Sequence, residues 1–507
     1  MNELMNSMET KMAINVGSSS IKTSVFYNLD RLDININFIG LRTQKVKLQY
    51  NGVQGVRNQT FEVNIRDDLR KAAAITIDKV AKTIEKLRWP KPSVIGHRVK
   101  FAGFGKAVEP FTEAIEAIMQ FNDYLSSRHN HLCLKVLEEC KLAFPDASQL
   151  LVRDQAVDDL SLHREHRVPF DHAFIKRYGL IAHGYHGLAI KACLDKVKQY
   201  IQTEKFSGTI CQVGSGVSFS AVDHGQVTYN TMQYAACDGP IMHNRMGTQP
   251  AGITLRLLKY GLDPSTLSSI YNRTSGIYGL AGLPSDSTIT VEDILTSPKF
   301  IEAKQSYLKA NGVELFRTVA EAPNASNFIF SGGLATKHRW LGPALLQSAK
   351  AISRLTMEKL AEQLADPSAH TVQADGITLH LVEIDEQTCI LNELEKASDT
   401  TNSLDWSKGI CEVPGSAIAT VQEGKCSWGP GKISLCLPET DFIFDSNKLP
   451  EAYIMVGPQR SDFFFRASYA RNFGVPAIFI GTDIWEAHHC LGKKIYLDTP
   501  TRTAVIL

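Results

Sequence analysis

Three glycine- and serine-rich turns are the segments of this sequence best suited to chemistry. They lie at 17–20 (GSSS), 214–216 (GSG) and 331–333 (SGG), each directly after a short apolar run. Glycine and serine let successive backbone N–H groups converge on one point, where they can hold a phosphate, and serine hydroxyls add donors. One such turn is more often an ordinary hairpin, but three together favour a phosphate site. The sequence contains no GxxxxGK[ST] loop of the Walker type.

The segments beside these turns have the patterns of regular elements. Alternate residues of 21–27 are apolar or β-branched, which predicts a strand with one buried face. The strand–turn–strand unit of 11–27 recurs at 209–222, so an internal duplication is expected. Apolar residues recur at helical spacing within 69–89, which predicts a helix there.

Composition excludes several classes of protein. The 507 residues are 44% hydrophobic and 21% charged, as in globular proteins of about three domains. With 54 Lys+Arg against 53 Asp+Glu, the chain lacks the basic field that nucleic acid or an anionic membrane would attract. Ten cysteines without a CxxC pair argue against a disulfide scaffold or zinc ribbon. The polar N-terminus and short apolar runs predict a cytoplasmic protein.

A polar stretch divides the chain. Residues 396–408 lack an apolar face and are predicted to be a linker. Residues 409–507, dense in short strand patterns and Gly/Pro turns, are predicted to form a separate module.

Ordered motifs before this linker resemble the acetate kinase family of carboxylate kinases, at the family's spacing and over about residues 12–395. The motifs are NVGSSSIK at 15–22, GHRV at 96–99, HN at 129–130, VRDQA at 152–156, YG at 178–179, GYHG at 184–187, NRMG at 244–247, SGIYG at 275–279 and SD at 285–286.

This resemblance implies an α/β protein with the duplicated actin/hexokinase-type (ribonuclease H-like) kinase fold. Residues 12–160 would form half I, with 375–395 returning to it, and 161–374 would form half II. The implied activity is phosphoryl transfer to or from a small carboxylate, with Mg²⁺ and ATP, in a homodimer.

The resemblance also implies roles for single residues. Arg98 and Arg245 would neutralise the transferring group, since guanidiniums stay charged and bind two oxygens at once. His186 would donate a hydrogen bond to that group, and Asp154 would orient the acceptor, an arginine or the metal. Asn15 and Glu386 would lie at the Mg²⁺ ion. The residues expected to hold the donor phosphates are Asn15, Ser18, Ser20, Lys22, Gly214, Ser215, Gly216, Asp286, Gly332 and Gly333.

Departures from the family pattern concern both substrates. The turn at 212–216 reads QVGSG, the segment 333–337 reads GLATK, and Thr288 stands where an arginine is expected beside the nucleobase. Pyrophosphate is therefore an alternative donor to ATP. The acceptor pocket, apolar in acetate kinases, would be lined by Lys100, Arg128, Tyr185 and Cys237. Buried cations need a counter-charge, so we expect an acceptor more polar than acetate, unless the long cationic side chains reach solvent.

The C-terminal module resembles the swivelling phosphohistidine domain of phosphoenolpyruvate-utilising enzymes. The matching segments are VPGSA at 413–417, ARNFGVPA at 470–477 and GKKIYLD at 492–498. Phe465 stands where that family has its histidine, and a phenyl ring cannot carry a phosphoryl group. His488 and His489 lie elsewhere in the module, so we expect a lid, a dimerisation element or a ligand sensor.

Two other functions remain open. A non-catalytic metabolite sensor would explain the altered donor turns and the missing histidine, although binding alone does not require Arg98, Asp154, His186 and Arg245 together. A sugar kinase would use Asp154 as general base, and the carboxylate-kinase motifs disfavour it.

Overall fold

The computed structural model describes most of the chain before residue 400. The described residues are 9–17, 20–37, 39, 44–52, 55–65, 68–102, 107–121, 123–156, 168–171, 180, 182–201, 205–284 and 287–399, together with six strands of the C-terminal region. Within these residues no helix is long and apolar enough to span a membrane.

Half I is built on an eight-stranded sheet in the order β5-β4-β3-β2-β1-β6-β8-β7. Its strands are β1 (Lys11–Val16), β2 (Ser20–Tyr27), β3 (Asp30–Asn37), β4 (Gln44–Gly52), β5 (Gly55–Val63), β6 (Val94–Val99), β7 (Val108–Pro110) and β8 (Ser148–Arg153). The central strands β1, β6 and β8 are parallel, whereas β1 to β5 form an antiparallel meander. The parallel strands therefore end together at one edge of the sheet.

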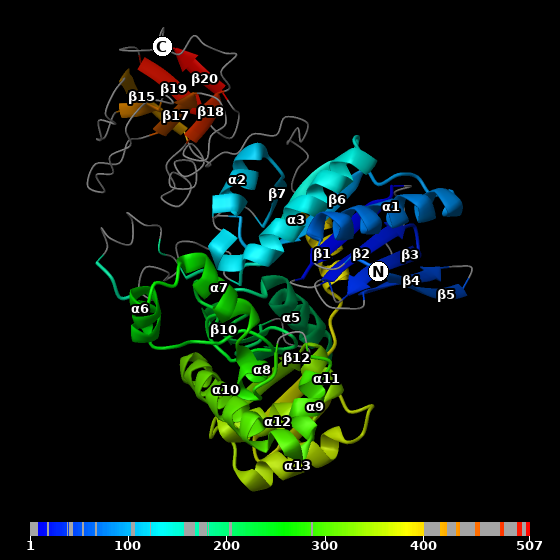
Figure 1. The fold of residues 1–507 in the computed structure, drawn as a ribbon, viewed down its shortest axis with the longest axis vertical. Coiled ribbons are helices and arrows are strands. Elements are labelled where there is room, and N and C mark those ends of the chain that lie inside the picture. The colour runs from blue at the N-terminus through cyan, green and yellow to red at the C-terminus, as the bar shows by residue number, and fades with distance from the viewer. Residues whose placement is uncertain are drawn as a thin grey trace.

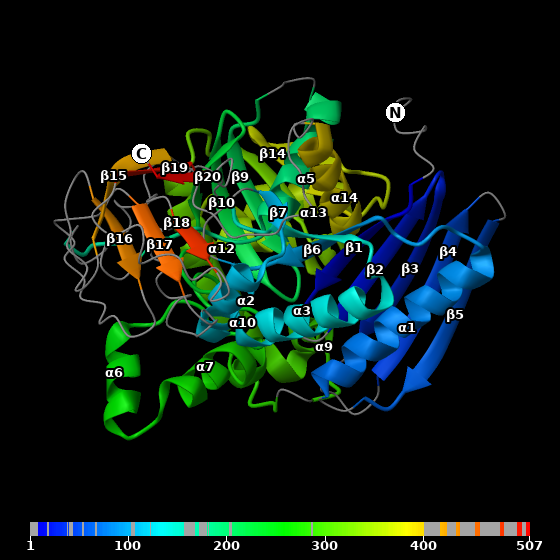
Figure 2. The same cartoon turned by 90° about the horizontal axis from the view of Figure 1, so that it is seen from above.

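Helices cover this sheet, as the apolar spacing predicts. In α1 (Leu69–Leu87), Ile77, Val80 and Ile84 are buried, and the Asp68 side chain caps the helix by accepting a hydrogen bond from the Lys71 amide. Figure 2 shows α1 beside α3 (Asp123–Ala143) across one face of the sheet. The short helix α2 (Glu113–Phe121) precedes α3.

Half II has a six-stranded sheet in the order β11-β10-β9-β12-β14-β13. Its strands are β9 (Gly208–Val213), β10 (Val217–Asp223), β11 (Gln226–Asn230), β12 (Asn327–Ser331), β13 (Thr371–Ala374) and β14 (Ile377–Val382). Its helices are α5 (Gly187–Ile201), α6 (Ala251–Lys259), α7 (Pro264–Arg273), α8 (Gly276–Leu280), α9 (Val291–Thr296), α10 (Ile301–Glu321), α11 (Gly333–Lys337), α12 (Leu341–Ser348) and α13 (Arg354–Leu364). A 3₁₀ turn, η1 (Pro298–Phe300), precedes α10.

The two sheets repeat one arrangement. In half I, β1 forms a hairpin with β2 and pairs in parallel with β6. In half II, β9 forms a hairpin with β10 and pairs in parallel with β12. The expected duplication of a strand–turn–strand unit is therefore present in the fold. Figure 1 shows the two halves, one in blue and cyan and the other in green and yellow.

The return to half I begins later than the predicted residue 375. Strand β14 is paired with β12 in the half II sheet because its apolar residues complete that core. Among the described elements after β14, helix α14 (Glu386–Asp399) packs on half I. Its Ile390 and Leu394 lie so close to Gly96 that a Cβ atom there would lie 2.7 Å from Leu394. The helix runs to Asp399, so the first residues of the predicted linker are helical.

The described part of the C-terminal region is a separate six-stranded sheet in the order β18-β17-β16-β15-β19-β20. Its strands are β15 (Ser416–Gln422), β16 (Lys432–Cys436), β17 (Ala452–Val456), β18 (Ala477–Ile480), β19 (Lys494–Asp498) and β20 (Thr503–Ile506). Phe465, His488 and His489 lie outside the described residues.

Candidate active site

Four polar side chains from four elements form one connected group. Asn15 on β1 is the register partner of Arg98 on β6, Asp154 directly follows β8 and Glu386 begins α14. Arg98 Nη1 donates to Asn15 Oδ1 at 2.8 Å, and Nη2 donates to Asp154 Oδ2. Asn15 Nδ2 in turn donates to Glu386 Oε2. The parallel strands thus bring together Asn15, Arg98 and Asp154, and the start of α14 adds Glu386.

Charges within this group stabilise one another. Burial lowers the pKa of Arg98, but the charges of Asp154 and Glu386 outweigh it and raise the pKa above its usual value. Burial raises the pKa of Glu386, but the charges of Arg98 and Lys22 and the Asn15 hydrogen bond outweigh it and lower the pKa. Arg98 and Glu386 are therefore both charged at neutral pH.

Asp154 also fixes the start of α5. Its carboxylate Oδ1 accepts a hydrogen bond from the Leu188 amide at 3.3 Å, and its backbone carbonyl accepts from the Gly187 amide at 3.1 Å. A Cβ atom at Gly187 would lie 1.8 Å from the Gln155 carbonyl oxygen, so only glycine permits this approach. The sequence predicted Asp154 as a site residue, and the structure adds this capping contact.

His186 lies directly before α5 in the left-handed region, at φ 63°. Its Nδ1 is hydrogen-bonded to the Ser218 hydroxyl on β10 at 2.8 Å. Burial and the charges of Lys100, Arg98 and Arg245 lower its pKa well below the usual value, so the imidazole is neutral at neutral pH. Sequence reasoning missed Ser218, whose available signal was its position two residues after Gly216, as the second residue of β10.

Arg245 contacts a carbonyl, a thioether and an imidazole. Nη1 donates to the Ala236 carbonyl at 3.2 Å and contacts Met242 Sδ at 3.5 Å, while Nη2 lies 3.5 Å from His129 Nε2. Among the described residues it forms no ion pair with a carboxylate. Burial is the largest influence on its pKa, which is lowered. His129 belonged to a recognised motif, but sequence reasoning assigned it no role at Arg245.

Both arginines act on the same imidazole. The charge of Arg98 also lowers the pKa of Arg245, and a Cβ atom on Gly216 would lie 3.2 Å from His186 Nε2 and 3.7 Å from Arg245 Nη1. The Arg98 and Arg245 charges therefore act at the neutral His186 imidazole, beside Gly216.

Two of the three predicted turns adjoin this group and each other. The Gly214 amide donates to the Gly216 carbonyl at 2.9 Å, and a Cβ atom at Gly214 would lie 3.8 Å from the Gly333 amide. Gly332, at φ 91°, approaches Val213 so closely that a Cβ atom would meet its carbonyl oxygen at 2.6 Å. The Ser215 carbonyl accepts from His243.

In the remaining turn, the Gly17 amide donates to the Ser20 carbonyl at 2.8 Å. Lys22 is exposed beside it, and its charge acts on Glu386. Ser18 and Asp286, both predicted donor residues, lie outside the described residues.

Two of the predicted acceptor residues, Lys100 and Tyr185, lie against each other. The Lys100 ammonium is 5.7 Å from the centre of the Tyr185 ring. The Tyr185 hydroxyl donates to the Tyr234 carbonyl at 3.3 Å. Burial raises the pKa of Cys237 to about 12, so its thiol is neutral, and its electrostatic effect on Arg245 places it nearby. Arg128 is on α3, and its side chain is outside the described part.

Oxygen donors suitable for Mg²⁺ are present at Asn15, Asp154 and Glu386. No group of three His, Cys, Asp or Glu side chains in the described residues could enclose a metal. Mg²⁺ commonly uses one or two protein carboxylates together with substrate phosphates. The Asn15–Glu386 pair fits this mode of binding, with Glu386 charged and Asn15 held beside it.

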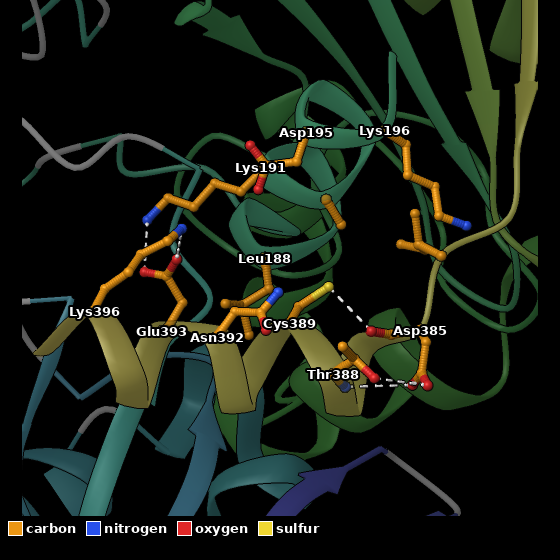
Figure 3. Close-up of a pocket in the computed structure, with 12 residues that line it drawn as sticks. Leu188, Lys191, Asp195, Lys196, Asp385, Thr388, Cys389, Asn392, Glu393 and Lys396 are labelled. Carbon is orange, nitrogen blue, oxygen red and sulfur yellow. Dashed lines mark hydrogen bonds and ion pairs between the residues drawn. The ribbon is translucent and has the colours of Figure 1, made fainter. Parts of the chain in front are cut away.

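A cavity of about 230 Å³ lies between α5 and α14. Figure 3 shows Lys191 and Lys396 directed at Glu393, and these groups form ion pairs of 3.5 and 2.9 Å. Lys196 donates to the Glu383 carbonyl instead. The cavity includes none of the predicted site residues.

Known proteins are similar to this chain in sequence. Residues 10–335 match the family described as the acetokinase family. The acetate kinase of Clostridioides difficile is 26% identical over 326 residues, covering 60% of this chain and 80% of that protein. The acetate kinase of Brachyspira hyodysenteriae is 23% identical over 401 residues, covering 77% of this chain and 98% of that protein.

Solved structures share the fold. A propionate kinase from Francisella tularensis aligns with a TM-score of 0.61 at 16% identity, over 76% of this chain and 99% of that one. The acetate kinase of Porphyromonas gingivalis aligns with a TM-score of 0.59 at 17% identity, with the same coverage. The expected duplicated actin-like α/β fold is confirmed. With the family matched over residues 10–335, the chain belongs to the acetokinase family.

Proposed function

We propose that this protein is a carboxylate kinase that moves a phosphoryl group to or from a small carboxylate through an acyl phosphate. A carboxylate oxygen would attack the terminal phosphorus of the donor, and the bond from that phosphorus to the donor's bridging oxygen would break. The observation that carries the proposal is the grouping of Arg98, Arg245 and a neutral His186, whose charges and contacts converge on one place.

Each member of the group has a distinct proposed role. Arg98 and Arg245 would balance the negative charge that gathers when two anions approach each other. With the Ser218 hydroxyl as donor to Nδ1, His186 would carry its proton on Nε2, which is the atom beside Gly216. A neutral imidazole in this tautomer can donate a hydrogen bond to the transferring group. Asp154 would hold Arg98 in place for this step.

The donor would lie along the turns at 17–20, 214–216 and 332–333, with Mg²⁺ at Asn15 and Glu386. ATP is the donor that family membership favours, and Mg²⁺ would supply charge neutralisation between donor phosphates. The altered segments 212–216 and 333–337 support pyrophosphate as the second candidate. The acceptor is proposed to be more polar than acetate because Lys100 lies at the predicted acceptor wall.

The test is hydroxamate trapping of acyl phosphate, with carboxylates offered alongside ATP or pyrophosphate. We expect product with wild type, and a loss of kcat/KM of about a thousandfold in Arg98→Ala and in Arg245→Ala. Arg317→Ala, at an exposed arginine on α10, is the matched control and should retain activity. Product that survives both site substitutions would reject the assignment. A metabolite that binds without any turnover would favour the sensor function instead.

We also propose that the protein is a homodimer. None of the α6 residues is buried, and the helix exposes Ile253, Leu255 and Leu258. A contiguous set of exposed apolar side chains is typical of an interaction surface. Light scattering after size exclusion should give a dimer mass for wild type and a monomer mass for Leu255→Glu; a wild-type monomer would contradict the proposal.

A further inference from the structure

Lys100 has surroundings unlike those of the other cations in the site. Its side chain is 5% exposed. Within the described residues its ammonium makes no hydrogen bond or ion pair, and it lies against the face of Tyr185 at 5.7 Å. Burying an ammonium group without a charged or hydrogen-bonding partner is costly. The position is therefore one that an anion from outside the chain would stabilise.

The nearby carboxylates are paired with other groups and do not form an ion pair with the Lys100 ammonium. Asp154 is paired with Arg98 and with the Leu188 amide, and Glu386 accepts from Asn15. Both raise the pKa of Lys100, but burial and the positive charges of Arg245 and Arg98 outweigh them and lower it well below its usual value. The positive charges of Arg245 and Arg98 therefore affect Lys100 more strongly than the negative charges of Asp154 and Glu386 do.

Aromatic rings form the wall behind Lys100. The Phe101 ring stacks on His183 at 4.5 Å, and His183 meets the edge of Tyr185 at 4.8 Å. Burial raises the pKa of Tyr185 well above its usual value, so its hydroxyl stays protonated. An acceptor that lies beside Lys100 would therefore meet these aromatic rings.

We propose that Lys100 binds a second carboxylate of the acceptor, so that the enzyme phosphorylates a short dicarboxylate in preference to a monocarboxylate. This inference rests on the proposed carboxylate kinase function. One carboxylate attacks the terminal phosphorus of the donor, and the electron pair of the broken P–O bond leaves with the nucleoside diphosphate or phosphate. The second carboxylate is unchanged and stays paired with Lys100.

A second role for Lys100 would be to bind the transferring phosphoryl group together with Arg98 and Arg245. The two roles predict different kinetics. A lysine that binds the phosphoryl group helps every acceptor equally, whereas one that binds the distal carboxylate helps dicarboxylates alone.

The experiment compares wild type with Lys100→Met, which keeps the length of the side chain and removes its charge. Malonate and succinate are compared with acetate and propionate by hydroxamate trapping. We expect kcat/KM of wild type to be at least tenfold higher for a dicarboxylate than for propionate. Lys100→Met should lower the dicarboxylate value about a hundredfold, mainly through KM, and leave or raise the propionate value. Lys82→Met, at an exposed lysine of α1, is the control.

Binding measured without turnover separates this inference from the proposed function. Calorimetry should show that succinate or malonate binds wild type and that this binding is lost in Lys100→Met. If dicarboxylates bind in this way but no acyl phosphate forms with either donor, the kinase proposal fails and the Lys100 assignment stands. Equal losses for mono- and dicarboxylates in Lys100→Met, or wild-type binding of no dicarboxylate, overturn the assignment.

Discussion

Removal of the Asp154 carboxylate tests the central ion pair of the site directly. The Arg98 and Asp154 side chains are 8% and 1% exposed, so their pairing is a buried one. In Asp154→Ala, the guanidinium would keep its hydrogen bond to Asn15 and its attraction to Glu386 but lose its nearest counter-charge. The Leu188 amide at the start of α5 would lose its acceptor as well.

The expected loss can be built from these contacts. Removing one partner of a buried ion pair costs about 3–5 kcal/mol, and the remaining Glu386 charge places this case at about 3 kcal/mol. The lost hydrogen bond at the helix start adds about 1 kcal/mol. We therefore expect Asp154→Ala to lower the free energy of unfolding of half I by about 4 kcal/mol. The double variant Arg98→Met/Asp154→Ala should be about 2 kcal/mol more stable than Asp154→Ala, because no unpaired guanidinium remains.

Hydrogen exchange in increasing urea, followed by mass spectrometry of peptides from β6 and β8, reports this stability locally. Asp78→Ala is the control, because Asp78 forms an exposed pair with Lys82 on α1 and should cost less than about 0.5 kcal/mol. A loss below about 1 kcal/mol in Asp154→Ala, or a double variant no better than the single one, would refute the reasoning about this pair.

Three further perturbations address other parts of the site. Burial lowers the pKa of His97 to about 4. The unfolded chain therefore binds a proton that the folded chain does not, and the free energy of unfolding falls as the pH drops below about 6.5. Urea unfolding at pH 7 and pH 5 measures this loss, and His97→Gln should remove about 2 kcal/mol of it. Gly216→Ala would place a methyl group 3.2 Å from the His186 ring and should lower kcat about tenfold, whereas Gly252→Ala, with open space around it, should keep kcat. Because the pKa of His186 is lowered well below its usual value, kcat should show no step near pH 6.5, and a step that disappears in His186→Asn would contradict this.

Part of this site was predictable because motifs preserve residue type and order. Asn15, Arg98, Asp154 and Glu386 were all expected from the sequence. The meeting of the first three follows from the shared edge of parallel strands, whereas Glu386 is brought in by helix α14. The hydroxyl of Ser218 at His186 was not expected, since the two residues lie on separate elements that meet only in the folded chain. The boundary at residue 375 was misplaced for a similar reason, because apolar strand patterns do not say which sheet a strand joins.

The sequence by itself determined the family, the order of the elements and the types of charge available to the site, since these depend on local pattern and residue chemistry. Only the tertiary structure decided which charges are paired. Arg98 is paired with a carboxylate, Arg245 donates to a backbone carbonyl and Lys100 lies against an aromatic ring. Ionic interactions weaken with distance and depend on burial, and both quantities arise only when elements far apart in the chain pack together.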